Sequence, residues 1–229
     1  MKKLTTLLAG IVLTAGANAA TVAFTDSYGL AITNWNNPIA ASLFDASLGT
    51  LNSATFSFTY DIVQTFRAEN TGATADTITP VVGANMLFRK SASTLLNTVL
   101  TGSSTAFNAS AFDGTIDYAG TSGLNFGDLT AGKADSITLT GAALASLIGV
   151  GTLGSAGYDV RAVGTGALQT DNGNLASFIS TQARYNLNVV YDYTAKIPPP
   201  NNVPEPSSLA LFGVALLGLA TARSKAKKD

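Results

Sequence analysis

The sequence predicts an all-β fold, an antiparallel β-sandwich with one or two short helices, between an N-terminal signal helix and a C-terminal hydrophobic helix. Three observations predict it. Apolar and polar residues alternate with a period of two along several segments. Glycine-rich turn sequences separate these segments, and helical segments do not alternate regularly with them. Many strands joined by such turns are typical of a sandwich rather than of a parallel sheet.

The N-terminus has the features of a secretory signal peptide. Lys2 and Lys3 precede an apolar stretch over residues 4–14, and Ala17 and Ala19 place small side chains at the two positions that determine cleavage. We therefore expect signal peptidase to remove residues 1–19 and to leave a mature chain that starts at Ala20.

The body of the protein is expected over residues 20–196. Its clearest strands are residues 54–62 and 184–193, where apolar and polar side chains alternate. Shorter strands are predicted at 22–25, 30–35, 86–90, 95–100, 136–140 and 158–163. Turns are predicted at 70–72, 121–123 and 171–174, and short helices at 141–148 and 174–179.

The C-terminus combines three features in a fixed order. A proline-rich spacer at 197–202 leads to Val203-Pro204-Glu205-Pro206, and an apolar stretch follows over 207–222. Its 16 residues would form a helix of roughly 24 Å, short for a bilayer core of about 30 Å. The basic residues that end the chain are Arg223, Lys225, Lys227 and Lys228. Basic residues on one side of the apolar stretch would keep the C-terminus in the cytoplasm and the body outside.

Residues 203–229 resemble the PEP-CTERM sorting signal of exported Gram-negative bacterial proteins, with a transmembrane-like segment at 207–222. The resemblance implies a transient inner-membrane tether and an exosortase-type membrane protease that recognises Pro204-Glu205-Pro206 and cuts near it. The product would reside at the cell surface or in the extracellular matrix. A plain C-terminal membrane anchor is the alternative. The same tail also carries the label of an ice-binding protein C-terminal domain, which describes the tail only.

The body has a resemblance of its own. The segment from Phe44 to Leu51 is similar to the F-D-P-S-L-G-T-L opening of the choice-of-anchor E domain, with Ala46 in place of proline. Segments 117–123, 147–153 and 189–194 also look similar, so the resemblance covers most of residues 20–194. It implies a β-domain with no known activity.

Composition limits the chemistry. The chain has neither cysteine nor histidine, which excludes Ser-His-Asp triads, Cys-His dyads and His-ligated metals. Residues 20–203 include seven basic and twelve acidic residues, which gives a formal charge of −5. This negative charge argues against a nucleic-acid partner. We therefore expect no cofactor, no catalytic residue and a non-enzymatic surface or extracellular-matrix protein associated with exopolysaccharide in a biofilm. The alternative is a secreted carbohydrate-binding or carbohydrate-cleaving β-sandwich.

A few residues allow sharper hypotheses. Asp113, Asp117 and Asp171 could supply oxygen ligands to calcium, but aspartate beside glycine is also common in ordinary turns. Residues 149–154 match G-x-G-x-x-G without the following helix that a dinucleotide site requires. A glycosidase would need two carboxyl groups about 5–10 Å apart. Thr55, Ser57 and Thr59 put hydroxyl groups on one strand face, and the sequence shows one such strand rather than the several that an ice-binding plane requires.

Overall fold

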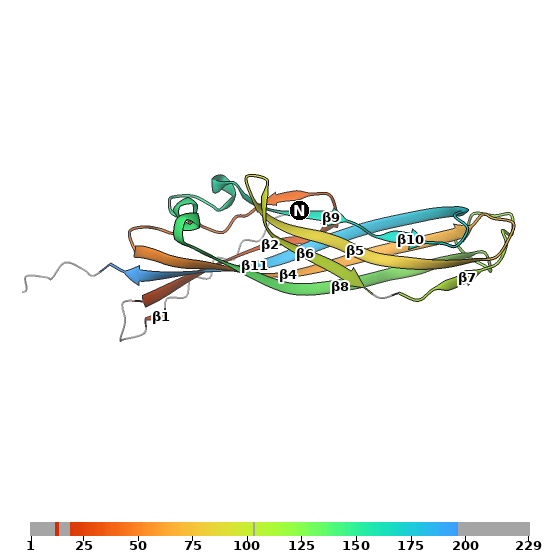
Figure 1. Cartoon of the computed structure of the whole chain (residues 1–229), viewed down its shortest axis with the longest axis horizontal. Coiled ribbons are helices and arrows are strands. Elements are labelled where there is room, and N and C mark those ends of the chain that lie inside the picture. Colours follow the sequence, from red (N-terminus) through yellow and green to blue (C-terminus); the bar gives the residue numbers. More distant parts are fainter. Residues whose placement is uncertain (1–11, 14–18, 103, 197–229) are drawn as a thin grey trace, which may run out of the picture. The chain divides into compact units, whose positions relative to one another are not determined.

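The computed structural model describes residues 12–13, 19–102 and 104–196. Contacts divide the chain into two units, residues 1–195 and 196–229, and the described fold belongs to the first. In the described residues, the first unit consists of two antiparallel sheets packed together and two short 3₁₀ helices (Figure 1). The predicted β-sandwich is confirmed.

The first sheet contains the longest strands. Its order is β1 (Val12–Leu13), β2 (Ala19–Ile32), β11 (Leu175–Ala195), β4 (Gly49–Asn70) and β8 (Gly123–Thr140). Strand β4 pairs with β11 and β8 along almost its whole length. Since β4 and β11 are more than 100 residues apart in sequence, this pairing ties the two halves of the body together.

The second sheet is built around β5 (Asp76–Lys90). Its order is β10 (Ala167–Gln169), β5, β9 (Tyr158–Gly164) and β3 (Asn36–Pro38), while β6 (Ser93–Gly102) and β7 (Phe107–Ala109) also pair with β5. The 3₁₀ helices η1 (Gly141–Leu147) and η2 (Gly154–Ala156) lie between β8 and β9.

The core lies between the sheets. Alternate residues of β4 point inward, and Phe56 and Phe58 contact Phe88 of the second sheet with ring centroids 4.8 and 5.2 Å apart. Gln64 continues this row as a buried polar residue. Its side chain accepts a hydrogen bond from the Gly83 amide at 2.7 Å and donates one to Thr181 Oγ1 at 2.6 Å. Because these partners lie on both sheets, the amide links them without leaving its polar atoms unpaired.

The two ends of the sandwich are closed differently. At the apolar end, η1 and the loop over 39–48 cover the core, and Phe44 packs on Tyr191 and Tyr193 with centroids 5.8 and 5.2 Å away. At the polar end, where Figure 1 labels β7, the loops 71–75, 110–122 and 170–174 meet around Asn70. The Asn70 amide donates to the carbonyls of Thr74 and Ser110, both at 2.7 Å.

The structure also corrects and extends the predicted elements. The predicted helix at 141–148 is present as η1, but the predicted helix at 174–179 is wrong. Those residues begin β11, where Leu175 pairs with Asn70 and Ile179 with Phe66. Long-range pairing with β4 overrides the weak local preference of the segment. The strand predicted at 30–35 ends at Ile32.

The two helices predicted to flank the body fall largely outside the described residues. Within the predicted N-terminal helix, only Val12–Leu13 is described, and it pairs as a strand with Ala20 and Thr21. The apolar stretch 207–222 lies outside the described residues. Among the residues that the structure does describe, no helix is long and hydrophobic enough to cross a bilayer.

Candidate functional site

The outer face of the first sheet carries polar side chains in register across four strands. The rows run from β2 through β11 and β4 to β8. The first row is Thr25, Asn188, Ser57 and Ser136, and the second is Ser27, Asn186, Thr59 and Ala134. From the sequence we expected a single strand with this pattern. That expectation was too narrow, because the register of the sheet aligns four strands.

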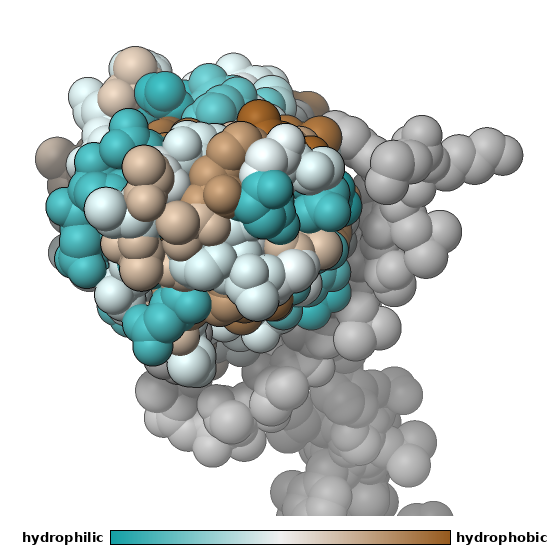
Figure 2. All heavy atoms as spheres, turned by 90° about the vertical axis from the view of Figure 1, so that its right-hand side faces the viewer, coloured by the Kyte–Doolittle hydropathy of each residue, from teal (hydrophilic) through white to brown (hydrophobic). Residues whose placement is uncertain are grey.

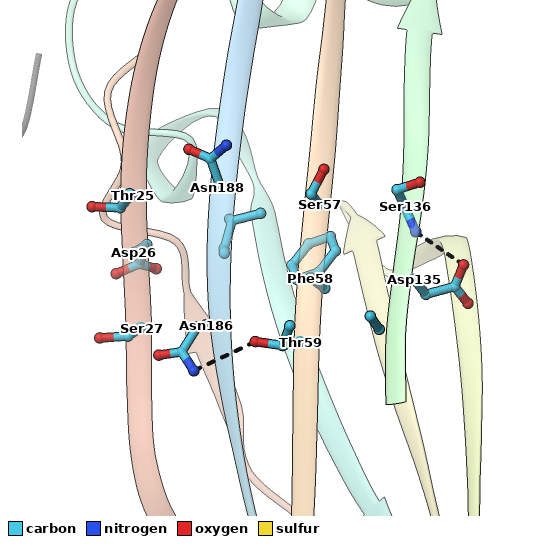
Figure 3. A pocket seen from close by; sticks show the side chains of 12 residues that line it. Thr25, Asp26, Ser27, Ser57, Phe58, Thr59, Asp135, Ser136, Asn186 and Asn188 are labelled. Atoms are coloured by element: carbon cyan, nitrogen blue, oxygen red, sulfur yellow. Dashed lines mark hydrogen bonds between the residues drawn. The ribbon is translucent and has the colours of Figure 1, made fainter. Parts of the chain in front are cut away.

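These rows line a hollow with a volume of about 810 Å³. We call its seven exposed polar residues the polar face: Thr25, Ser27, Ser57, Thr59, Ser136, Asn186 and Asn188. Figure 3 shows these side chains on four neighbouring strands, with the Asn186 amide directed to Thr59 Oγ1 at 3.5 Å. Short serine side chains leave the sheet floor open, so the hollow offers hydroxyl and amide groups to a ligand along the sheet.

Two aspartates lie at the opposite rims of the hollow, Asp26 on β2 and Asp135 on β8 (Figure 3). Asp26 Oδ2 accepts hydrogen bonds from the Tyr185 hydroxyl at 2.8 Å and from the Ala40 amide at 3.1 Å. Burial raises the pKa of Tyr185 well above its ordinary value, and the charge of the nearby Asp26 is the second largest cause. Asp135 Oδ2 accepts a hydrogen bond from Thr98 at 2.9 Å.

The rim aspartates do not form a carboxyl pair of the glycosidase type. Strands β11 and β4 lie between them, and three inter-strand spacings of about 4.8 Å separate their backbones by about 14 Å. That exceeds the roughly 5–10 Å that a glycosidase requires. Intramolecular donors also occupy oxygens of both carboxylates. The geometry of the hollow therefore suits binding rather than acid–base chemistry.

A second candidate site lies at the polar end. Glu69, on the outer side of β4, is 0% exposed, and its Oε2 accepts a hydrogen bond from the Tyr118 amide at 2.8 Å. Its Oε1 is buried without a hydrogen-bond partner, as is Ser122 Oγ. Asp76, which is 5% exposed, accepts a hydrogen bond from the Asp171 amide and has a buried, unpartnered Oδ2. Figure 2 views this end and shows hydrophilic and apolar residues intermixed on its surface.

The three predicted calcium ligands lie in turns of this end and do not converge. Asp113 Oδ1 accepts a hydrogen bond from the Thr115 amide, and Asp117 Oδ1 from the Ala119 amide, both at 2.9 Å. Asp171 lies on a different loop. Within the described parts of the chain, no three acidic, histidine or cysteine side chains are grouped to hold a metal. The glycine-rich residues 149–154 form bends and an isolated bridge before η2, with no helix to receive a phosphate.

The predicted sorting residues fall mostly outside the described chain. These are Ala17, Val203, Pro204, Glu205, Pro206, Arg223, Lys225, Lys227 and Lys228. Ala19 is described: it is exposed and begins β2, next to the buried Ala20. Cleavage before Ala20 would thus leave the core residues of β2 in the mature protein.

Comparison with known proteins identifies the C-terminal region. Residues 202–225 match the family of the PEP-CTERM protein-sorting motif. The chain carries a PEP-CTERM sorting motif. Proteins with this motif are exported, tethered to the membrane through it and processed by exosortase. The matched family is a sorting motif and not a catalytic family, and the choice-of-anchor E resemblance of the body stays a prediction.

The other comparisons add little. No curated protein matches the chain. Among solved structures, the T=1 particles derived from infectious bursal virus are 10% identical over 85% of this chain and 46% of that one, with a TM-score of 0.13. The structure of infectious bursal disease virus Gx strain is 14% identical over 86% of this chain and 48% of that chain, with a TM-score of 0.10. This chain therefore spans about half the length of the solved chains that it matches.

Sequence reasoning missed part of both sites. Serine, threonine or asparagine at alternate positions of each strand is visible in the sequence, but nothing local aligns the strands. Glu69 carries a weak signal as the only glutamate between residues 20 and 203. Its burial depends on a loop that lies about 50 residues further along the chain.

Proposed function

We propose that the protein is an exported, non-enzymatic component of the cell surface or extracellular matrix that binds exopolysaccharide through its polar face. The PEP-CTERM motif supports export and exosortase processing. The hollow across four strands supports the binding role, since it exposes hydroxyl and amide groups in regular rows. Transient partners in this proposal are signal peptidase, exosortase and the inner membrane.

The chemistry of the polar face favours a neutral, hydrated polymer. Hydroxyl and amide groups can donate and accept hydrogen bonds with sugar hydroxyls, each contributing about 0.5–1.5 kcal/mol. Because such single contacts are weak, useful retention depends on many repeats of one polymer reaching many copies of the protein. The charges that line the hollow are Asp26 and Asp135, which are engaged internally, so binding should depend little on salt.

The test is binding of the mature protein to exopolysaccharide purified from the native matrix. Asn188→Leu places an apolar side chain in the centre of the polar face and should weaken retention in affinity electrophoresis by about five- to tenfold. Asn97→Leu makes the same change at an exposed position of β6 on the other sheet and should leave retention unchanged. Equal retention of both variants would contradict the proposed face.

Processing has a separate test. Replacing Pro204-Glu205-Pro206 by alanines should retain a longer, membrane-bound form, because the proposed exosortase recognition sequence is lost. Intact-mass analysis of the wild-type surface form should find neither residues 1–19 nor the residues from Lys225 to Asp229. Detection of those C-terminal residues on the surface form would support a plain membrane anchor instead.

A further inference from the structure

The loop over 117–123 encloses the carboxylate of Glu69. Glu69 pairs with Gly123 across β4 and β8, and its Oε2 accepts the hydrogen bond from Tyr118. A Cβ atom at position 123 would lie only 1.9 Å from that oxygen, so the carboxylate occupies the space that glycine leaves open. The turn closes behind it through the hydrogen bond from the Gly123 amide to the Ala119 carbonyl at 3.1 Å.

The Glu69 carboxyl group has no cationic partner among the described residues. The ion pairs found there are Arg89 with Asp159 and Arg184 with Asp61. Glu69 is fully buried, and Oε1 has no hydrogen-bond donor. A buried, ionised carboxylate is costly unless it is paired, hydrogen-bonded or bound to a metal. The unpartnered Oε1 therefore requires an explanation.

A second carboxylate and a hydroxyl lie in the same turn. Asp117 accepts from the amide of Ala119, and Glu69 accepts from the neighbouring amide of Tyr118. Neighbouring amide nitrogens are within about 4 Å of one another, so the two carboxylates are bound to adjacent points of one loop. Ser122, which precedes Gly123, contributes a fully buried Oγ without a partner. Asp117 itself is exposed, which gives an ion a route from solvent.

We propose that Glu69 and Asp117 bind one Ca²⁺ ion that fixes the 117–123 loop against β4. Calcium takes six to eight oxygen ligands in flexible arrangements, including main-chain carbonyls, hydroxyls and water. Since no third acidic side chain joins these two in the described chain, such oxygens, Ser122 Oγ among them, complete the shell. This site is independent of the polysaccharide-binding role of the polar face.

The test is thermal unfolding of the mature exported protein, stripped with EDTA and then titrated with Ca²⁺. Extracellular calcium modules bind with dissociation constants of about 10⁻⁴–10⁻³ M, so 10 mM Ca²⁺ should raise Tm by about 5 °C. Glu69→Gln preserves the acceptor for the Tyr118 amide but should abolish this shift. Asp117→Asn preserves the turn and should weaken the apparent affinity for Ca²⁺ roughly tenfold.

Asp128→Asn is the matched control. It removes one charge from an exposed aspartate of β8 that accepts a hydrogen bond from Thr65, and it should keep the full calcium response. Two results would overturn the inference. One is an equal Tm with EDTA and with 10 mM Ca²⁺ in the wild type. The other is a Glu69→Gln variant that is stabilised by Ca²⁺ as strongly as the wild type, which would assign the ion to other ligands.

Discussion

At the apolar end of the sandwich, rings and aliphatic side chains fill the space between the sheets, whereas at the polar end carboxylates and amides are buried beside a small apolar cluster of Ala68, Ile78 and Ala109. Phe44 is 0% exposed and packs on the last residues of β11. At the opposite end of β4, Asn70 and Glu69 are equally buried, and backbone groups of three loops surround them. The same pair of strands, β4 and β11, reaches both ends.

The two ends therefore depend on different forces. Apolar burial at Phe44 is non-directional and insensitive to ions. At the polar end the buried groups depend on directional hydrogen bonds, and each donor or acceptor that loses its partner costs about 1–3 kcal/mol. Segments 44–51, 147–153 and 189–194 meet at the apolar end, and segment 117–123 surrounds Glu69 at the polar end.

The largest effect is expected at the apolar end. Phe44→Ala should lower the free energy of unfolding by about 3–5 kcal/mol, because it removes a fully buried ring and leaves a cavity. Urea unfolding of the mature protein measures the change. Leu48→Ala, in the same loop at an exposed residue, should cost less than about 1 kcal/mol. A Phe44→Ala loss no larger than that of the control would show that the apolar end contributes little.

The matching change at the polar end is Asn70→Leu, which keeps the size of the side chain and removes its hydrogen bonds. The carbonyls of Thr74 and Ser110 and the amide of Gly72 would lose their partners, so we expect a loss of about 3 kcal/mol. Amide hydrogen exchange should also accelerate in the 110–122 loop. Asn52→Leu, an exposed asparagine of β4, is the control and should have little effect. Unchanged exchange in the loop would contradict the role of Asn70.

One glycine at each end of the sandwich leaves no room for a side chain. A Cβ at Gly49 would lie 2.0 Å from the main-chain oxygen of Thr194, and one at Gly123 would lie 1.9 Å from Glu69 Oε2 and 2.8 Å from the main-chain nitrogen of Ala119. Gly49 also has a φ of +153°, which residues with a side chain rarely adopt. Gly49→Ala should therefore destabilise by about 2–3 kcal/mol and Gly123→Ala by about 1–2 kcal/mol, as measured by urea unfolding. Gly123→Ala alone should also remove the calcium response. A larger loss of stability for Gly123→Ala than for Gly49→Ala would contradict the added cost of the backbone conformation at Gly49.

The smallest effect is a pH dependence. Burial raises the pKa of Tyr60, Tyr185 and Tyr191 above the ordinary value of 10.0, with charged or titratable neighbours adding to it. As pH rises, the unfolded chain loses these protons before the folded protein does. The contribution of the three tyrosines to the free energy of unfolding is therefore fully present below pH 10 and declines above it. Tyr191→Phe should reduce that decline by about 1 kcal/mol between pH 10 and 11. Parallel stability profiles of variant and wild type across this range would contradict the prediction.

The strand at 54–62 was predictable because its signal is local. Alternating Phe56, Phe58 and Tyr60 with hydroxyl residues defines two faces whatever the strand pairs with. The segment at 174–179 has no such alternation, and its pairing with β4 decides its conformation. For the same reason, the hydroxyl pattern of Ser57 and Thr59 was visible, but its alignment with Asn186 and Asn188 was not.

The PEP-CTERM motif, the alternating strands and the exclusion of histidine and cysteine chemistry could be predicted from the sequence alone. Those properties depend on residue type and on spacing over a few positions. The register that lines up the polar face, and the enclosure of Glu69 by the loop over 117–123, follow from the tertiary structure. Both depend on contacts between residues far apart in the chain, and such contacts are set by the packing of the whole sandwich rather than by any local pattern.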